Sequence, residues 1–150
     1  MARVTIERLR HAYVAAPSEP AHWALKQVDF VWEDGGAYAL LGPSGCGKTT
    51  MLNIISGLVR PTEGRILFGE RDVTDVPTEQ RNIAQVFQFP VLYDTMTVRQ
   101  NLAFPLVNRG LRGREVAARV AEVAEMLDLA PLLDRRAAGL GAAEKQKISL

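Results

Sequence analysis

One segment constrains this chain more than any other: residues 42–49 are Gly-Pro-Ser-Gly-Cys-Gly-Lys-Thr. They fit the pattern G-x-x-x-x-G-K-[ST], which in phosphate-binding loops lies between a strand and a helix. Glycines are needed there because side chains would keep the backbone N–H groups away from the anion. A helix that follows the loop adds the positive end of its dipole. The segment therefore predicts a phosphate-binding loop.

The side chains of this loop extend the prediction to a nucleotide with a metal ion. Lys48 places a positive charge near the β- and γ-phosphates, and the Thr49 hydroxyl is an oxygen ligand suited to Mg²⁺. We therefore expect ATP and Mg²⁺ as cofactors, with Lys48 as a catalytic residue and Thr49 as a metal ligand. The predicted nucleotide-binding set of the loop is Gly42, Pro43, Ser44, Gly45, Cys46, Gly47, Lys48, Thr49 and Thr50.

The segments around the loop predict an α/β fold. Residues 37–41 form a short apolar run between glycines, which is typical of a buried strand. A helix is predicted after the loop, with Leu52, Ile55 and Leu58 at helical spacing. Another strand is predicted at 83–87. A strand, loop and helix in this order indicate a P-loop NTPase core with a parallel sheet.

Other segments have clear local patterns. Further strands are predicted at 4–7, 28–30 and 65–68. Thr97 and Gln100 have the spacing of a capping box, so a helix is predicted from Val98. Residues 114–129 carry one apolar face at helical spacing and predict an amphipathic helix.

Composition excludes several classes of protein. The net charge is +1, so no strong basic field indicates a nucleic-acid partner. One cysteine cannot form an internal disulfide and fits a reducing compartment. We find no apolar run of transmembrane length and no secretory signal, and we expect a cytoplasmic location. His11 and His22 show no partner pattern, and we interpret both as surface residues.

Beyond the loop, several segments in order resemble the ATP-binding subunits of ABC transporters. The similarity spans nearly the whole chain and is greatest to importers of carbohydrates and polyols, including glycerol systems. The resemblance identifies residues 1–150 as the N-terminal part of an ABC-type ATP-binding domain. It implies an antiparallel β-subdomain and an α-helical subdomain over about 91–140. The segments that carry the resemblance are 40–50, 55–58, 61–66, 81–88, 96–98 and 101–104.

The resemblance assigns two further site residues. Gln88 would contact Mg²⁺ and the attacking water, as a catalytic residue and metal ligand, and couple nucleotide state to the helical subdomain. Tyr13 matches the aromatic that stacks on adenine, although Trp23 is an alternative because the intervening loop changes the spacing. Phe89 and Tyr93, after Gln88, either face a permease or belong to the core of the helical subdomain.

One motif departs from the family pattern. Where the family has Leu-Ser-Gly-Gly-Gln, residues 140–144 are Leu-Gly-Ala-Ala-Glu. Gly141 lacks the hydroxyl donor, and the carboxylate of Glu144 would repel a polyphosphate unless it points away. We therefore expect a weakened half-site, and a second ATP-binding subunit that is a different chain rather than an identical copy.

The resemblance also implies a longer protein. The Walker B aspartate and catalytic glutamate of the family are expected after Leu150, so these residues alone would be deficient in hydrolysis. The expected function is ATP hydrolysis coupled to solute import, at the inner face of the cell membrane. Its partners would be transmembrane permease subunits and, indirectly, a periplasmic solute-binding protein. The alternatives are a soluble ABC-type ATPase acting on DNA and a nucleotide-binding module without hydrolysis.

Overall fold

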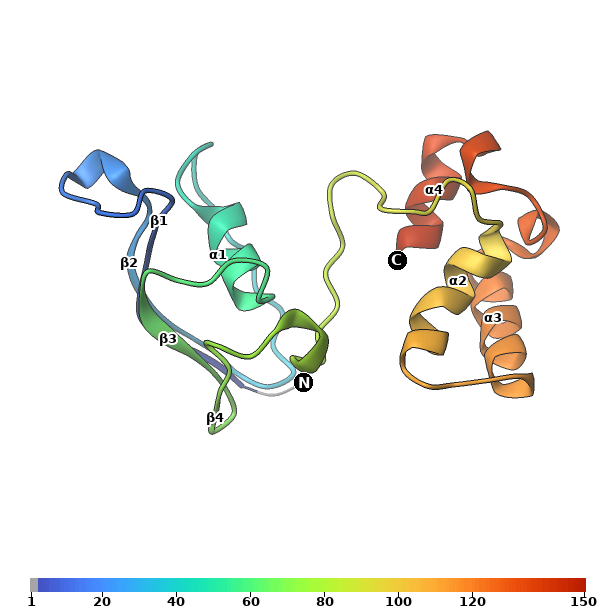
Figure 1. The fold of residues 1–150 in the computed structure, drawn as a ribbon, viewed down its shortest axis with the longest axis horizontal. Helices are drawn as coiled ribbons and strands as arrows, with labels where there is room; N and C mark the ends of the chain where they lie inside the picture. The colour runs from blue at the N-terminus through green and yellow to red at the C-terminus, as the bar shows by residue number, and fades with distance from the viewer. Residues whose placement is uncertain (1–2) are drawn as a thin grey trace. The chain divides into compact units, whose positions relative to one another are not determined.

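The computed structural model describes residues 3–150, which form two compact units (Figure 1). The first unit ends at Gln85 and holds the strands with one α-helix. The second unit runs from Val86 to Leu150, and all of its regular secondary structure is helical. Each unit has a hydrophobic core of its own.

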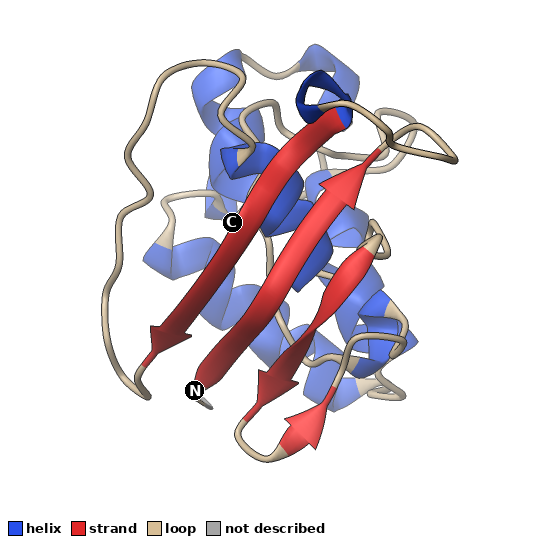
Figure 2. Cartoon of the chain, turned by 90° about the vertical axis from the view of Figure 1, so that its left-hand side faces the viewer, coloured by secondary structure: helices blue, strands red, loops and turns tan. Residues whose placement is uncertain are grey.

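The first unit contains a four-stranded sheet in the order β2-β1-β3-β4 (Figure 2). All three strand pairs are antiparallel. The strands predicted at 4–7, 28–30 and 65–68 lie in β1, β2 and β3, which confirms these predictions. The bounds are Val4–Ala12 for β1, Trp23–Trp32 for β2, Glu63–Phe68 for β3 and Arg71–Asp72 for β4.

A bulge in β1 brings two apolar side chains to the same core. Ile6 and Leu9 are both buried although strict alternation would place them on opposite faces of the strand. Between them Arg8 has φ 48°, and the register with β2 shifts at this point. The Arg8 N–H, freed from the ladder, donates to the Asp29 carboxylate at 2.8 Å. The bulge therefore turns Leu9 inward.

Helix α1 (Lys48–Ile55) packs against this core and confirms the helix predicted after the loop. Its buried face differs from the one that spacing indicated. Met51 and Ile54 are buried, whereas Leu52 is 43% exposed and Leu58 is also exposed. The buried core residues of the unit are Ile6, Leu9, Leu25, Met51, Ile54, Ile55, Ile66 and Val73.

Two strand predictions are wrong in this structure. Residues 37–41 and 83–87 are irregular, and most of their side chains are exposed or half-buried. A strand is stable only when a neighbour completes its hydrogen-bond ladder. Among the described residues neither segment has such a neighbour, so the described sheet is wholly antiparallel and the predicted parallel pairing is not formed.

The second unit is built from helices α2 (Val98–Asn108), α3 (Arg114–Met126) and α4 (Ala142–Ser149). The capping box that starts α2 is confirmed. The Thr97 hydroxyl accepts from the backbone N–H of Gln100, and the side-chain oxygen of Gln100 accepts from the backbone N–H of Thr97. The core of this unit comprises Val98, Ala124, Leu129, Leu140 and Ile148. The short 3-10 helices of the chain are Pro20–His22, Thr78–Gln80, Ala130–Leu132 and Ala137–Gly139.

In the described part of the chain, every helix is too short or too polar to span a bilayer.

Candidate nucleotide-binding site

The phosphate-binding loop leads directly into α1 and follows a path that requires glycine. Gly47 caps the helix with φ +92°, a left-handed conformation that other residues rarely adopt. A Cβ atom there would lie 2.6 Å from the backbone oxygen of Ala24 in β2. The loop therefore crosses β2 at a distance that only glycine permits. Residues 42–46 are exposed.

The ammonium group of Lys48 holds the loop closed on itself. Its Nζ donates to the backbone oxygens of Gly42 and Pro43, both at 2.7 Å. The Cys46 sulfur lies 3.5 Å from the same nitrogen. Among residues 3–150 the ammonium bonds to carbonyl oxygens and pairs with no carboxylate, so its positive charge has no acidic counterpart there. The structure thus places a positive charge at the centre of the loop.

The first turn of α1 offers the other groups that an anion needs. The intrahelical ladder begins with the Met51 N–H, which donates to Gly47 O at 2.8 Å. The N–H groups that precede Met51 stay outside this ladder, at the positive end of the helix dipole. The Thr49 side chain is exposed beside them and fits an oxygen ligand for Mg²⁺. Thr50 is buried.

The two candidate aromatics have different surroundings. Tyr13 is 66% exposed, and its hydroxyl lies 3.4 Å from the Thr50 hydroxyl in α1. One face of the Trp23 ring is covered by the guanidinium of Arg10, whose central carbon lies 3.6 Å from the ring centroid. Tyr13 thus contacts the loop helix and is the more exposed of the two rings, whereas Trp23 is half-buried.

Gln88 belongs to the second unit, in an exposed, irregular segment that precedes α2. Among the apolar residues after Gln88, some are exposed and others belong to the core of the unit, so both alternatives left open by the sequence occur. Phe89 is 76% exposed, whereas Leu92 packs against the core of the unit. Tyr93 is half exposed and its ring lies 4.7 Å from that of Phe104.

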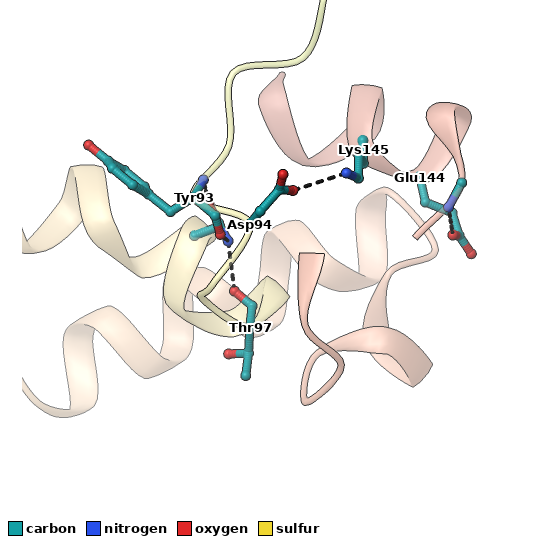
Figure 3. A network of polar contacts seen from close by, with 7 residues as sticks. Tyr93, Asp94, Thr97, Glu144 and Lys145 are labelled. Atoms are coloured by element: carbon teal, nitrogen blue, oxygen red, sulfur yellow. Dashed lines mark hydrogen bonds and ion pairs between the residues drawn. The ribbon is translucent and has the colours of Figure 1, made fainter. Parts of the chain in front are cut away.

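Residues 140–144 lead into the first turn of α4, and the Glu144 carboxylate lies at the N-terminus of this helix. The Glu144 carboxylate accepts from the Gly141 N–H at 2.8 Å (Figure 3). A carboxylate at a helix N-terminus is favourable because it neutralises the dipole. It also takes the donor that a phosphate would otherwise use. The carboxylate thus turns back onto its own helix.

Two lysines fix α4 within its unit. Figure 3 shows Lys145 reaching the Asp94 carboxylate, at 3.0 Å. Lys147 donates to the backbone oxygen of Leu127 at 2.9 Å, at the end of α3. These contacts fix the orientation of the Glu144 segment.

The turn before α2 is closed by the buried side-chain amide of Asn101, which bonds to both the backbone N–H and the backbone oxygen of Tyr93.

His11 and Arg81 are buried polar side chains whose burial the sequence did not indicate. His11, interpreted above as a surface residue, is only 7% exposed, so that prediction is wrong. Its Nδ1 lies 3.3 Å from the Thr62 hydroxyl, and its ring packs edge-on against Tyr13 at 4.6 Å. Arg81 is also buried, and the sequence gives little sign of this because arginine side chains are mostly exposed in proteins.

Burial lowers the pKa of His11 below its ordinary value of 6.5, because the charged ring is desolvated. The folded state therefore prefers neutral His11, and the unfolded state takes up the proton first as the pH falls. The resulting stability is complete above pH 6.5 and is lost as the pH falls from there toward the folded pKa.

We therefore expect the free energy of unfolding to decrease when the pH is lowered through 6.5, and to decrease less in His11→Gln. Urea unfolding on both sides of that pH measures this difference. An identical pH dependence in the two proteins would contradict the role of His11.

Comparisons with known proteins agree with this geometry. The sequence model of the family described as "ABC transporter" matches residues 25–150. A sn-glycerol-3-phosphate import ATP-binding protein of Jannaschia sp. (strain CCS1) is 39% identical over all 150 residues. A trehalose import ATP-binding protein of Mycobacterium tuberculosis is 37% identical over the same length. The chain spans 42% of the first relative and 37% of the second.

Solved structures show the same fold. A dimeric ATP-binding cassette in a post-hydrolysis state, bound to ADP and Pi, matches with a TM-score of 0.82 and 27% identity. The match covers 97% of this chain and 66% of that one. The predicted P-loop α/β class is thereby confirmed. With a family match over most of its length, the chain belongs to the ABC transporter family.

Proposed function

We propose that this chain binds ATP with Mg²⁺ at residues 42–50 and, within a longer protein, couples ATP hydrolysis to solute import. The observation that carries the proposal is the Lys48 ammonium at the centre of a loop that leads into the N-terminus of α1. A cation and free N–H groups converging on one exposed point suit a polyphosphate. Chains of this family are ATPases.

When a triphosphate binds, the Lys48 ammonium would replace its present hydrogen-bond acceptors with phosphate oxygens. Its two carbonyl bonds would give way to charge-assisted bonds with the β- and γ-phosphate oxygens, which are stronger. The Thr49 hydroxyl would ligate Mg²⁺, and Gln88 would contact Mg²⁺ and the attacking water. Such phosphoryl transfer depends mostly on positioning and charge stabilisation. The proposed roles of this chain follow that pattern.

For the adenine base we propose stacking on Tyr13 rather than Trp23. The proposal is supported by the exposed ring of Tyr13 and its hydroxyl contact with Thr50 in the loop helix. The Arg10 guanidinium already stacks on one face of Trp23 and would compete with a base for that face. An aromatic ring and adenine gain from stacking because both offer flat π-faces.

The names of the relatives support a solute of the carbohydrate or polyol class, since they name importers of sn-glycerol-3-phosphate and trehalose. In such a system the partners would be transmembrane permease subunits and, indirectly, a periplasmic solute-binding protein. The chain would then act at the inner face of the membrane. The exposed side chain of Phe89, after Gln88, supports contact with a permease there.

The second ATP-binding subunit is proposed to be a different chain. Gly141 offers no hydroxyl, and the Glu144 carboxylate already occupies the backbone donor at the start of α4. In the family this segment closes over the ATP held by the other subunit. Two copies of this chain would therefore make a poor pair, whereas a partner with an intact segment would close one complete site.

Lys48→Ala is expected to weaken MgATP binding about 10- to 100-fold, because a charged hydrogen bond contributes about 1.5–3 kcal/mol. Isothermal titration calorimetry measures the dissociation constant. Lys26→Ala, which removes an exposed lysine from β2, is the matched control and leaves the affinity unchanged. Unchanged affinity in Lys48→Ala would contradict the proposal.

The same titration tests the aromatic assignment. Tyr13→Ala is expected to weaken ATP binding, while Trp23→Ala leaves it unchanged. Loss of affinity in Trp23→Ala alone would assign the stacking role to the other ring.

Restoring the family pattern is expected to strengthen self-pairing. Gly141→Ser combined with Glu144→Gln returns a hydroxyl and removes a carboxylate, so ATP-dependent dimers should form at least about tenfold more tightly, a difference of about 1.4 kcal/mol. The Gly141 backbone has φ −71°, which serine adopts freely. Analytical ultracentrifugation with MgATP measures the dimer dissociation constant.

Glu125→Gln is the control for the change in net charge, because it removes an exposed carboxylate on α3. It is expected to leave self-association unchanged. Equal dimer affinities for the repaired and original chains would refute the weakened half-site.

A further inference from the structure

Arg81 is a buried cation in the first unit. It is 5% exposed, and among the described residues it is the one lysine or arginine that is buried. A buried charge is costly unless hydrogen bonds replace its lost hydration. All of the hydrogen-bond partners of its guanidinium are backbone carbonyl oxygens. Burial lowers the pKa of Arg81, because the charged guanidinium is desolvated.

Two of these carbonyls belong to the last turn of α1. Nη1 of Arg81 donates to Ile54 O at 2.8 Å and to Ile55 O at 2.9 Å. The carbonyls at a helix C-terminus lack intrahelical partners and carry the negative end of the dipole. Arg81 therefore caps α1 at the end opposite to the phosphate-binding loop.

The other two carbonyls lie in the segment that follows β4. Nε donates to Val76 O at 2.7 Å, and Nη2 donates to Thr74 O at 3.0 Å. A planar guanidinium with three donating nitrogens fixes the orientation of everything it bonds. The C-terminal end of α1 and the chain just before Arg81 are thus joined through one rigid group.

Gly57 makes room for this group. The residue has φ +81° at the end of α1, and a Cβ there would lie 2.6 Å from Nε of Arg81. A second link runs beside it, because the Gln85 side chain donates to the Asn53 side chain in α1 at 3.3 Å. The segment 81–85, which continues toward Gln88, is therefore attached to the loop helix at both of its ends, through Arg81 and Gln85.

We propose that Arg81 is a positioning residue that links α1 to the segment leading to Gln88, so that nucleotide bound at the loop changes the state of residues 82–88. The proposal rests on the proposed function, since it requires ATP at the N-terminus of α1. An eight-residue helix is about 12 Å long and rigid, so a shift at one end moves the other. Arg81 transfers that shift to the segment it precedes.

Amide hydrogen exchange of residues 82–88, with and without MgATP, tests the link in the full-length protein. In the wild type, MgATP is expected to change the exchange of these amides. Arg81→Lys keeps the charge but has one nitrogen in place of three. It should bind ATP within about threefold of the wild type, yet lose at least half of the exchange response. Arg60→Lys, at an exposed arginine paired with Asp75, should keep the full response.

A matched glycine pair tests the link from the other side. Gly57→Ala introduces a Cβ against Arg81, whereas Gly69→Ala adds the same backbone strain with nothing within 4 Å. The response should fall in Gly57→Ala and persist in Gly69→Ala. This pair decides the question if Arg81→Lys fails to fold, as judged by circular dichroism.

The outcomes separate the two claims. A full exchange response in Arg81→Lys, or equal responses in the two glycine variants, overturns the role of Arg81. A wild type that binds ATP without any change at 82–88 also overturns it and leaves the proposed function intact. A wild type that binds no ATP refutes the proposed function itself.

Discussion

The bond between the Lys48 ammonium and the carbonyls of its own loop is the interaction on which the site depends. It holds residues 42–48 in a closed turn and keeps one positive charge at the start of α1. No carboxylate of the described residues pairs with this charge, so it remains available to an anion. Two features hold this turn against the sheet: Gly47 lies close to β2, and Met51 and Ile54 anchor α1 in the core.

The site is supported at both ends of a short helix. At the N-terminus the loop supplies the donors, and at the C-terminus the Arg81 guanidinium donates to the carbonyl oxygens of Ile54 and Ile55. In the second unit, the Glu144 carboxylate accepts the Gly141 N–H at the start of α4 and so places a negative charge there. Helix termini thus underlie three features: the proposed anion site at the start of α1, the burial of the Arg81 cation at its end, and the proposed weakening of the contact made by the start of α4.

Local patterns predicted the local structure well. The loop motif located α1, and the spacing of Thr97 and Gln100 located the start of α2, because these signals lie within a few residues of the element they specify. The strands predicted at 37–41 and 83–87 failed because an apolar run cannot show whether a neighbouring strand exists. The Arg8 bulge was also invisible, since it depends on pairing with β2.

The residues that the sequence missed depend on distant partners. The environment of His11 includes Thr62, and that of Arg81 includes the end of α1, so burial of either could be seen only in the fold. The family resemblance supplied Gln88 and Tyr13, which no spacing rule would have found. Their roles remain predictions, as does the set of loop residues, because the fold alone assigns no ligand contact.

The single cysteine of the chain gives the most direct test of the central claim. The Cys46 thiol is exposed, lies in the loop and is 3.5 Å from Nζ of Lys48. Alkylation by iodoacetamide, followed by mass spectrometry, should slow as MgATP is added and respond far less to AMP, which lacks the triphosphate tail. An alkylation rate that is the same with and without saturating MgATP, in a folded sample, would contradict the account.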